Sequence, residues 1–488
     1  MELIYDILKK LKRYEKRQIR NYFNASPFEY EKVGELFKLV TRYSDKEEAF
    51  FSQKLYGRDP DNTFRVTKAR LKKVLEDTVL NDKSFSEYSA DFIKAALFSN
   101  KRVLQGEILL GRGAYAASKN LLLQVIAKTK KFSLHGERFR AEMLLHRNQS
   151  INMSVNEFQK RTRRLLELNE INYKVNQAAI IHYSVTNILT HKSLSNEELK
   201  HYEEEIRRIE TIAEETQSPL ARQHYLMSRI LFLQYNYQYK EAIEFCRLQI
   251  ELLEQEPAVR SSQRLGSAQF QLTEALLRSG QLEEAAASVN ATLNFFSREE
   301  TNYLIVLGTA FRVAFFSDRW DKAEKIVQEA FDHPRFAASP FRAAIWHYCY
   351  SCVMLKTGQT SQALRALNES TLLLSDKMGW NLTFRLHEIM VLFEAEMYDL
   401  LETKILNMRQ FVKRTQKNSD LYRPMKLIQI LMEWHKNSLD IKKTYGSIKK
   451  QLTDLRNYHK EIPFDPSTGE LIRLENWMAE KNHNLVRP

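Results

Sequence analysis

The residues in this sequence that could carry out chemistry are few, and the clearest is the pair Cys349 and Cys352. Two thiols with this spacing share one face of a helix, where they could bind zinc or take part in redox chemistry. A structural zinc ion needs two further ligands, and the sequence contains no second CxxC pair. The stretch around the pair predicts a helix in which small residues pack, so we interpret both cysteines as core residues.

The other chemical signals are weaker. Gly111-Arg112-Gly113 lacks the third glycine and the Lys-Ser/Thr ending of a phosphate-binding loop. The 12 histidines form no HExxH pattern and no cluster with cysteine. Acidic runs such as residues 203–205 are typical of helix surfaces and nominate no general acid or base. We therefore predict a protein that is not an enzyme, with no catalytic residues, no bound metal and no cofactor.

Two basic runs could contact the phosphates of a nucleic acid, in which case affinity would fall steeply with salt. Tyr14, Tyr22 and Phe23 interleave the first run, but no helix-turn-helix or RNA-binding signature accompanies either one. A solvated helix surface is the alternative interpretation. The candidate anion contacts are Lys12, Arg13, Lys16, Arg17, Arg20, Lys160, Arg161, Arg163 and Arg164.

The composition indicates which elements must position these residues. The 488 residues include only 13 Gly and 10 Pro, so tight turns are few and long helices are favoured. Three cysteines cannot form a disulfide framework, which favours a reducing compartment. The N-terminus is unlike a secretory signal, and no apolar stretch is long enough to span a membrane. We predict an all-α, cytoplasmic protein.

The net charge of +13 is unevenly distributed. Residues 101–174 carry 15 Lys and Arg against 6 Asp and Glu, and residues 404–488 carry 17 against 9. Residues 175–403 are acidic, with 22 against 30. This asymmetry could serve an anionic partner at one end or head-to-tail association into a homo-oligomer, unless the basic helices are simply solvated.

The clearest internal repeat lies in residues 265–296, where two amphipathic segments flank a turn at Gly280. Apolar residues in the first segment recur at helical spacing, and a glycine can adopt the left-handed conformation that ends a helix. Ala285, five residues later, lets two helices approach closely. Small residues at the same place in similar patterns are Ser118, Ala242, Ala323 and Ala363, and weaker hairpins are predicted near Arg161, Tyr202 and Leu401.

These turns resemble the tetratricopeptide repeat, in which a turn glycine precedes an aromatic or apolar residue, a small residue and a later proline. The resemblance implies an α-solenoid, and the spacing of the eight positions predicts about eight antiparallel helix hairpins with a period of about 40 residues, longer than the usual repeat of about 34. Stacked hairpins bury a continuous core and form a superhelix whose first helices line a concave wall. We predict this domain over residues 89–415, between helical caps at residues 1–88 and 416–488.

The N-terminal stretch is similar to the start of an uncharacterised group of helical-repeat proteins from the Bacteroidota. The similarity rests on Glu-Lys-Arg at residues 15–17, followed by Tyr22 and Phe23. In that group a serine precedes the triplet and the aromatics follow directly, whereas here Tyr14 takes the serine place and the aromatics lie farther on. The resemblance implies a cytoplasmic repeat protein and no specific function.

Tetratricopeptide domains contact their ligands mainly through first-helix side chains, so the resemblance implies a mixed polar and aromatic wall. Such a wall suits an extended peptide or a partner helix. We therefore expect a scaffold or adaptor that binds a protein or peptide in the concave groove. Nucleic-acid binding by the basic N-terminal third and regulation by a sensed peptide are the alternatives. The predicted wall residues are His146, Asn187, His191, Phe270, Glu274, Arg312 and Tyr348.

Overall fold

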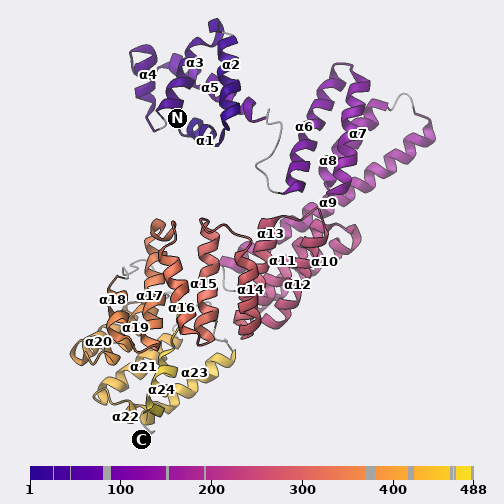
Figure 1. The fold of residues 1–488 in the computed structure, drawn as a ribbon. Helices are drawn as coiled ribbons and strands as arrows, with labels where there is room; N and C mark the ends of the chain where they lie inside the picture. The colour runs from indigo at the N-terminus through magenta and orange to yellow at the C-terminus, as the bar shows by residue number, and fades with distance from the viewer. Residues whose placement is uncertain are drawn as a thin grey trace. The chain divides into compact units, whose positions relative to one another are not determined.

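A computed structural model shows that every regular element in the described part of the chain is a helix, as the composition predicts (Figure 1). The structure describes residues 1–25, 27–43, 45–80, 90–149, 153–191, 194–369, 380–415, 422–461, 465–466 and 469–484. Within these ranges, no helix combines the length and the hydropathy needed to cross a membrane. The chain divides into two units, Met1–Leu165 and Leu166–Pro488.

The first unit contains eight complete helices and the start of a ninth, within its described residues. They are α1 (Glu2–Lys10), α2 (Arg13–Ala25), α3 (Pro27–Arg42), α4 (Glu48–Tyr56), α5 (Asn62–Leu80), α6 (Asp91–Gly111), α7 (Tyr115–Lys131), α8 (His135–Gln149) and α9 (Val155–His191). Helices α1 to α5 share a core that includes Ile19, Phe37, Phe51 and Leu71. Helices α6 to α8 share a separate core around Leu122. The first five helices therefore form a small bundle with its own core.

The second unit continues α9 and adds consecutive helices that pack on their neighbours along the chain, as in a solenoid (Figure 1). They are α10 (Asn196–Thr216), α11 (Pro219–Tyr235), α12 (Tyr239–Gln255), α13 (Ser262–Arg278), α14 (Leu282–Leu293), α15 (Thr301–Phe316), α16 (Trp320–Phe331), α17 (Pro340–Lys356), α18 (Thr360–Glu369), α19 (Trp380–Glu394), α20 (Tyr398–Thr415), α21 (Tyr422–Lys436), α22 (Ile441–Ser447), α23 (Lys449–Glu461) and α24 (Leu474–Asn484). One hydrophobic core runs from Ile230 in α11 to Met478 in α24.

The sharp turn inside each helix pair is set by one residue with positive φ. At the turn between α13 and α14, Gly280 has a φ of 79°. Its N–H donates to the carbonyl of Leu277, and the next N–H, of Gln281, donates to that of Leu276. This bonding satisfies carbonyls at the helix end and lets the chain reverse at once. The equivalent residues of the other pairs are Gly113, Tyr237, Asp318, Gly358 and Glu396.

Three of these turns do not use glycine. Tyr237, Asp318 and Glu396 have φ values of 60°, 56° and 59°. A left-handed backbone costs a residue with a Cβ about 1–2 kcal/mol, so packing of the flanking helices must hold these turns. The sequence marked these hairpins by the positions five residues later, Ala242, Ala323 and Leu401, and not by a turn glycine.

The turns make a direct prediction for stability. Gly280→Ala should lower the free energy of unfolding by about 1–2 kcal/mol, because the added Cβ meets no atom within 4 Å and only the backbone is strained. Asp318→Gly should raise it by about 0.5–1 kcal/mol, because it relieves the same strain. Urea unfolding of both variants measures the two effects, and a change of the same sign in both would contradict this account of the turns.

Close packing within the pairs follows the small residues that the sequence singled out. Ser118, Ala242, Ala285, Ala323 and Ala363 are all fully buried. In the α6–α7 pair, the hydroxyl of Ser118 donates to the carbonyl of Gly106 at 2.7 Å. A larger side chain at these positions would push the paired helices apart.

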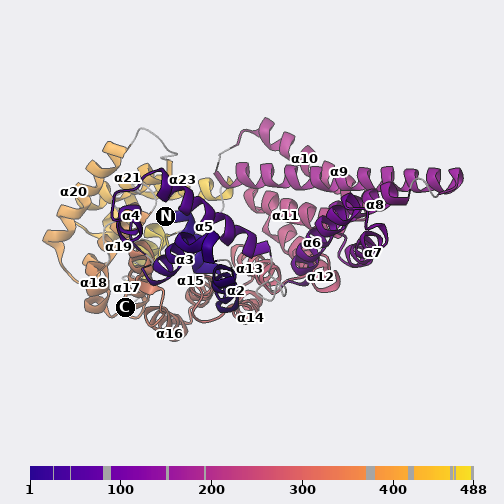
Figure 2. The same ribbon diagram turned by 90° about the horizontal axis from the view of Figure 1, so that it is seen from above.

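Helix α9 departs from the predicted pattern. It is one helix of 37 residues, and it runs through both the second helix of the predicted hairpin near Arg161 and the first helix of the next hairpin (Figure 2). Residues 171–177 (INYKVNQ) contain no glycine or proline that would end a helix. The predicted domain boundaries after residues 88 and 415 adjoin stretches outside the described residues and stay predictions.

Candidate functional site

The predicted wall residues of α13 and α15 lie on half-buried surface. Glu274 accepts a hydrogen bond from the hydroxyl of Thr309 at 2.5 Å and pairs with Arg278 at 3.7 Å. Phe270 and Arg312 are also half-buried, and no carboxylate within the described ranges pairs with Arg312. The contact between Glu274 and Thr309 joins the two successive helices α13 and α15.

Part of that face is covered by the chain's own C-terminal segment, which we define as residues 465–466 and 469–484. Asp465 forms an ion pair with Arg278 of α13 at 3.3 Å. The N–H of Leu471 donates to the hydroxyl of Tyr348 in α17 at 3.2 Å. Gly469 lies against Trp380 of α19, where a Cβ on the glycine would come within 3.0 Å of the ring. The segment thus crosses the first helices of three pairs.

Helix α24 anchors the rest of the C-terminal segment. The indole N–H of Trp477 donates to Glu394 of α19 at 2.9 Å, and Lys481 pairs with the same carboxylate at 2.7 Å. Trp477 and Met478 are 3% and 0% exposed. This degree of burial makes α24 a part of the core rather than a loosely bound tail.

The prediction that Tyr348 lies on the accessible wall is therefore wrong. Its side chain is 1% exposed and lies among Phe384, His387 and the C-terminal segment. Burial raises the pKa of its hydroxyl, which stays neutral. A residue in this place supports the fold and cannot touch a partner. Local spacing placed it on the wall, but a segment more than 120 residues away in sequence covers it.

An ion triad fixes the C-terminal segment to α21. Arg423 hydrogen-bonds to Glu470 at 2.7 Å and to Glu475 at 2.8 Å, and it reaches both oxygens of each carboxylate. The three side chains are only 10–15% exposed. Burial works against the charge of Arg423, but the two glutamates raise the pKa of its guanidinium above the ordinary value.

The other predicted wall residues lie on α8 and α9. His146 is half-buried, with its ring 4.5 Å from that of Phe158. Asn187 and His191 are exposed one turn apart on α9, and the His191 ring lies 2.9 Å from the Asn187 carbonyl. These two remain accessible to a partner.

The predicted anion contacts lie on α2 and α9. Arg13, Lys16, Arg17 and Arg20 are spaced so that they share one face of α2, and all but Lys16 are exposed. Lys12, just before α2, has its ammonium 5.7 Å from the ring of Tyr14. The structure therefore brings the first cationic run together on one surface.

The second cationic run, at the start of α9, is partly neutralised. Arg161 hydrogen-bonds to Gln149 at 2.6 Å and pairs with Glu157 at 3.4 Å. Arg164 pairs with Glu142 of α8 at 3.3 Å. Lys160 and Arg163 are exposed.

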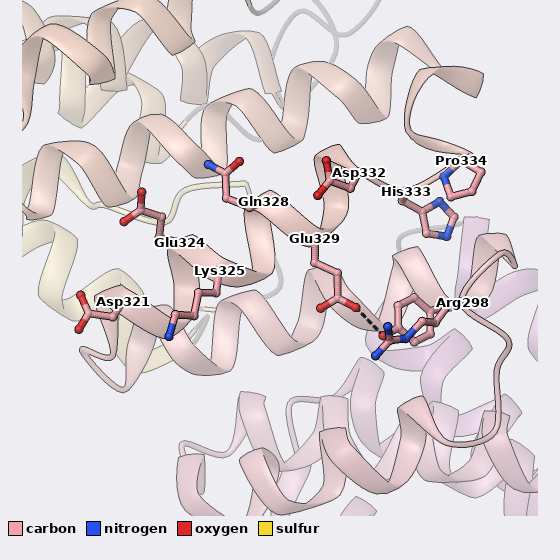
Figure 3. Close-up of a pocket in the computed structure, with 10 residues that line it drawn as sticks. Arg298, Asp321, Glu324, Lys325, Gln328, Glu329, Asp332, His333 and Pro334 are labelled. Atoms are coloured by element: carbon pink, nitrogen blue, oxygen red, sulfur yellow. Dashed lines mark hydrogen bonds between the residues drawn. The ribbon is translucent and has the colours of Figure 1, made fainter.

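A polar pocket of about 870 Å³ lies along α16 (Figure 3). Its carboxylates are Asp321, Glu324, Glu329 and Asp332, and its cationic side chains are Arg298 and Lys325. The hydroxyl of Tyr303 donates to Glu329 at 2.6 Å, the contact that Figure 3 marks. Burial, with this hydrogen bond, raises the pKa of Tyr303. Because both signs of charge line the pocket, its electrostatics favour no particular class of ligand.

A second depression is more selective. This acidic groove, of about 550 Å³, lies between the end of α10, the start of α11 and the end of α12. Tyr225, Phe245 and the 41% exposed Leu248 form an apolar part of its lining. The charged residues that line it are Glu210, Glu214, Glu251, Glu256 and a single cation, Arg222.

The carboxylates of the acidic groove have no cation of their own. Among the described residues, no lysine, arginine or histidine lies within salt-bridge distance of Glu210, Glu214, Glu251 or Glu256. Burial, together with a hydrogen bond to Glu210, raises the pKa of Tyr225. Sequence reasoning missed the groove because it interpreted these glutamates as solvated helix surface. The acidic balance of residues 175–403 was the available signal.

The cysteine pair lies in the core, as interpreted from the sequence. Cys349 and Cys352 are both buried in α17, and burial raises the pKa of Cys349 to about 12. A thiol with such a pKa is protonated at neutral pH and is a poor nucleophile or metal ligand. In the described part of the chain, no three His, Cys, Asp or Glu side chains gather as a metal site would require.

No protein-family model matches the chain, and no curated protein matches it.

Proposed function

We propose that the chain is a non-enzymatic scaffold that binds a segment of a partner protein on a tetratricopeptide-like solenoid of about eight helix hairpins with a period of about 40 residues. The left-handed turns at Gly113, Tyr237, Gly280, Asp318, Gly358 and Glu396 and the buried small residue that follows each of the first five support this assignment. A stack of similar hairpins presents a long surface of side chains, which suits recognition of an extended or helical segment.

One observation carries the proposal: the acidic groove has four carboxylates without a partner cation around an aromatic and aliphatic lining. Unneutralised charge of one sign in a cleft attracts the opposite charge and raises the rate of encounter. The apolar lining adds specificity for a side chain that can be buried against Tyr225, Phe245 and Leu248. The partner we propose is a segment with lysine or arginine residues beside a large apolar side chain.

This proposal moves the main binding surface away from the face that the repeat pattern favoured. The C-terminal segment covers that face at α17 and α19. The accessible remainder includes Asn187 and His191 on α9, and these stay in the proposed surface.

Binding of a simple probe tests the acidic groove. A fluorescein-labelled peptide of alternating lysine and leucine should bind the full chain, and its counterpart with glutamate in place of lysine should not. Glu214→Gln with Glu251→Gln should weaken binding about 5- to 30-fold, because each of the two partly exposed ion pairs contributes about 0.5–1 kcal/mol. Fluorescence anisotropy at low and high salt measures both effects.

The matched control makes the same change of net charge outside the groove. Glu197→Gln with Glu204→Gln replaces two exposed glutamates of α10. This variant should bind the lysine peptide as the unaltered chain does. Equal losses in both double variants would mean that the probe senses only overall charge, and the groove would be rejected as a binding site.

A further inference from the structure

Helix α9 carries a line of large apolar side chains that face water. Leu166, Tyr173 and Ile180 are 65%, 64% and 68% exposed, and Tyr183 is 64% exposed. The first three are seven residues apart, so they lie on nearly the same line along the helix. Single exposed apolar residues are ordinary on protein surfaces, but a regular line of them marks a surface that packs against something.

The line is separate from the face by which α9 joins its own unit. Val175, Ala178, Ile181, Val185 and Leu189 point the other way and pack in a core with α10 and α11. The exposed line is therefore not needed to hold α9 in place.

Polar but uncharged residues complete this surface. Asn169 and Asn176 are exposed and follow Leu166 and Tyr173 by three residues each. Together with Ile180 and Tyr183 they give the alternating spacing of three and four residues found along the seam of a coiled coil. We define these six residues as the α9 stripe, and none of them carries a charge.

We propose that the α9 stripe is a self-association surface, on which the α9 of a second copy of this chain packs side by side, parallel and in register. This arrangement does not depend on the acidic groove or on any foreign partner. It is a two-fold contact in which each stripe residue meets its own counterpart.

The choice of a second copy follows from what parallel, in-register pairing brings together. Leucine meets leucine and isoleucine meets isoleucine, so apolar groups bury apolar groups. Asn169 and Asn176 meet their own counterparts, and a side-chain amide can both donate to and accept from another amide. A buried asparagine at a seam position specifies register in coiled coils.

Charge does not oppose the pairing. The residues beside the stripe that would face each other across the pair include Asn172, Gln177, Ala179 and Ser184, and none is charged. Glu170 lies nearby, but its charge is matched by Lys174 of the same helix at 2.8 Å. Two identical surfaces with a net charge would repel each other. The α9 stripe has no charged residue, so this repulsion is absent.

The size of the stripe indicates a contact of modest strength. Each large side chain has roughly 100–150 Å² to bury, so two copies would bury about 900 Å² in all. This area is below the roughly 1,200 Å² of the smallest stable interfaces, so we expect a weak dimer that forms at micromolar concentrations.

The mass of the full chain in solution tests the proposal. Sedimentation equilibrium over a micromolar concentration series should show a monomer of 57.6 kDa going to a species of twice that mass. Tyr173→Glu should weaken dimerisation at least 10-fold, because it places two like charges at the centre of the pair. Tyr115→Glu, at a 59% exposed tyrosine of α7, is the matched control and should leave the dimer intact.

Circular dichroism should be unchanged in both variants, because both tyrosines are exposed. A monomer at every concentration would overturn the proposal, and so would a dimer that Tyr173→Glu leaves as strong as before.

A cysteine at the stripe tests orientation. The three native cysteines are buried, so Asn169→Cys adds a single accessible thiol. In a parallel, in-register pair the two introduced thiols lie together, and mild oxidation should give a disulfide-linked dimer that runs at double mass without reductant. If the unaltered chain forms dimers and Asn169→Cys fails to cross-link, the parallel arrangement is wrong.

Discussion

Replacing Arg423 with methionine is expected to lower the free energy of unfolding by about 3–5 kcal/mol at neutral pH. The guanidinium is 13% exposed and makes four hydrogen bonds to Glu470 and Glu475. Without it, two carboxylates that are 15% and 10% exposed lose the cation that hydrogen-bonds to both of them. Breaking a buried ion pair from one side is costly because the remaining charge has lost both water and its partner.

Urea unfolding followed by circular dichroism measures this loss of stability. Two further variants serve as its controls. Lys426→Met, on the same helix, removes a pair with Asp454 in which both partners are more exposed, and it should have a much smaller effect. Arg423→Met combined with Glu470→Gln and Glu475→Gln should recover part of the loss, because no charge is then left unpaired. If Lys426→Met lowered the free energy of unfolding as much as Arg423→Met, the ion triad would not be a larger source of stability than an ordinary ion pair.

The same variant should loosen the C-terminal segment first. Glu470 lies next to Leu471, whose N–H donates to Tyr348, so the triad and the cover over α17 are neighbours in the chain. Limited proteolysis of Arg423→Met is expected to cut within residues 465–473 before the helices of the solenoid.

Acid should destabilise this protein well above the range in which carboxylates titrate. His387 is fully buried and lies 2.9 Å from the hydroxyl of Ser351, and burial lowers its pKa from 6.5 to about 3. His224 is buried beside His182 and Arg264, and burial with these two neighbours lowers its pKa to about 4. Both imidazoles are therefore neutral in the folded protein at a pH where they would be charged in the unfolded chain.

The direction of the effect follows from proton binding. Because the unfolded state binds more protons, stability is complete above the unfolded pKa of 6.5 and is lost as pH falls toward the folded values. Each histidine should contribute a loss of about 1.4 kcal/mol per pH unit, or about 2–3 kcal/mol between pH 6.5 and about pH 4.5. Urea unfolding at a series of pH values measures this slope.

His387→Gln separates this cause from general acid effects. Glutamine keeps a hydrogen-bonding group near Ser351 but cannot gain a proton. The slope of the unfolding free energy against pH, between pH 6.5 and about pH 4.5, should therefore fall by about 1.4 kcal/mol per pH unit. His191→Gln, at an exposed position of α9, removes no buried imidazole and should leave the slope unchanged. An unchanged slope in His387→Gln would show that this histidine is not the source of the acid sensitivity.

The sequence by itself determined the helical class, the helix pairs around residues 265–296, and the close-packed positions at Ser118, Ala242, Ala285, Ala323 and Ala363. These features are local, since helical periodicity, a turn glycine and a small residue five places later all act within one hairpin. The turn glycine is not required, because the hairpins at Ala242 and Ala323 have left-handed turns at Tyr237 and Asp318. The local rules failed at α9, which continues through a predicted break.

Only the tertiary structure decided which predicted surfaces are open. Tyr348 has the right spacing for the wall, but the C-terminal segment returns over α17 and buries it. The acidic groove joins glutamates from α10 and α12, which sequence spacing treats as unrelated. In both cases the physical reason is the same: accessibility and unneutralised charge depend on neighbours far away in the chain, and a pattern within one hairpin carries no information about them.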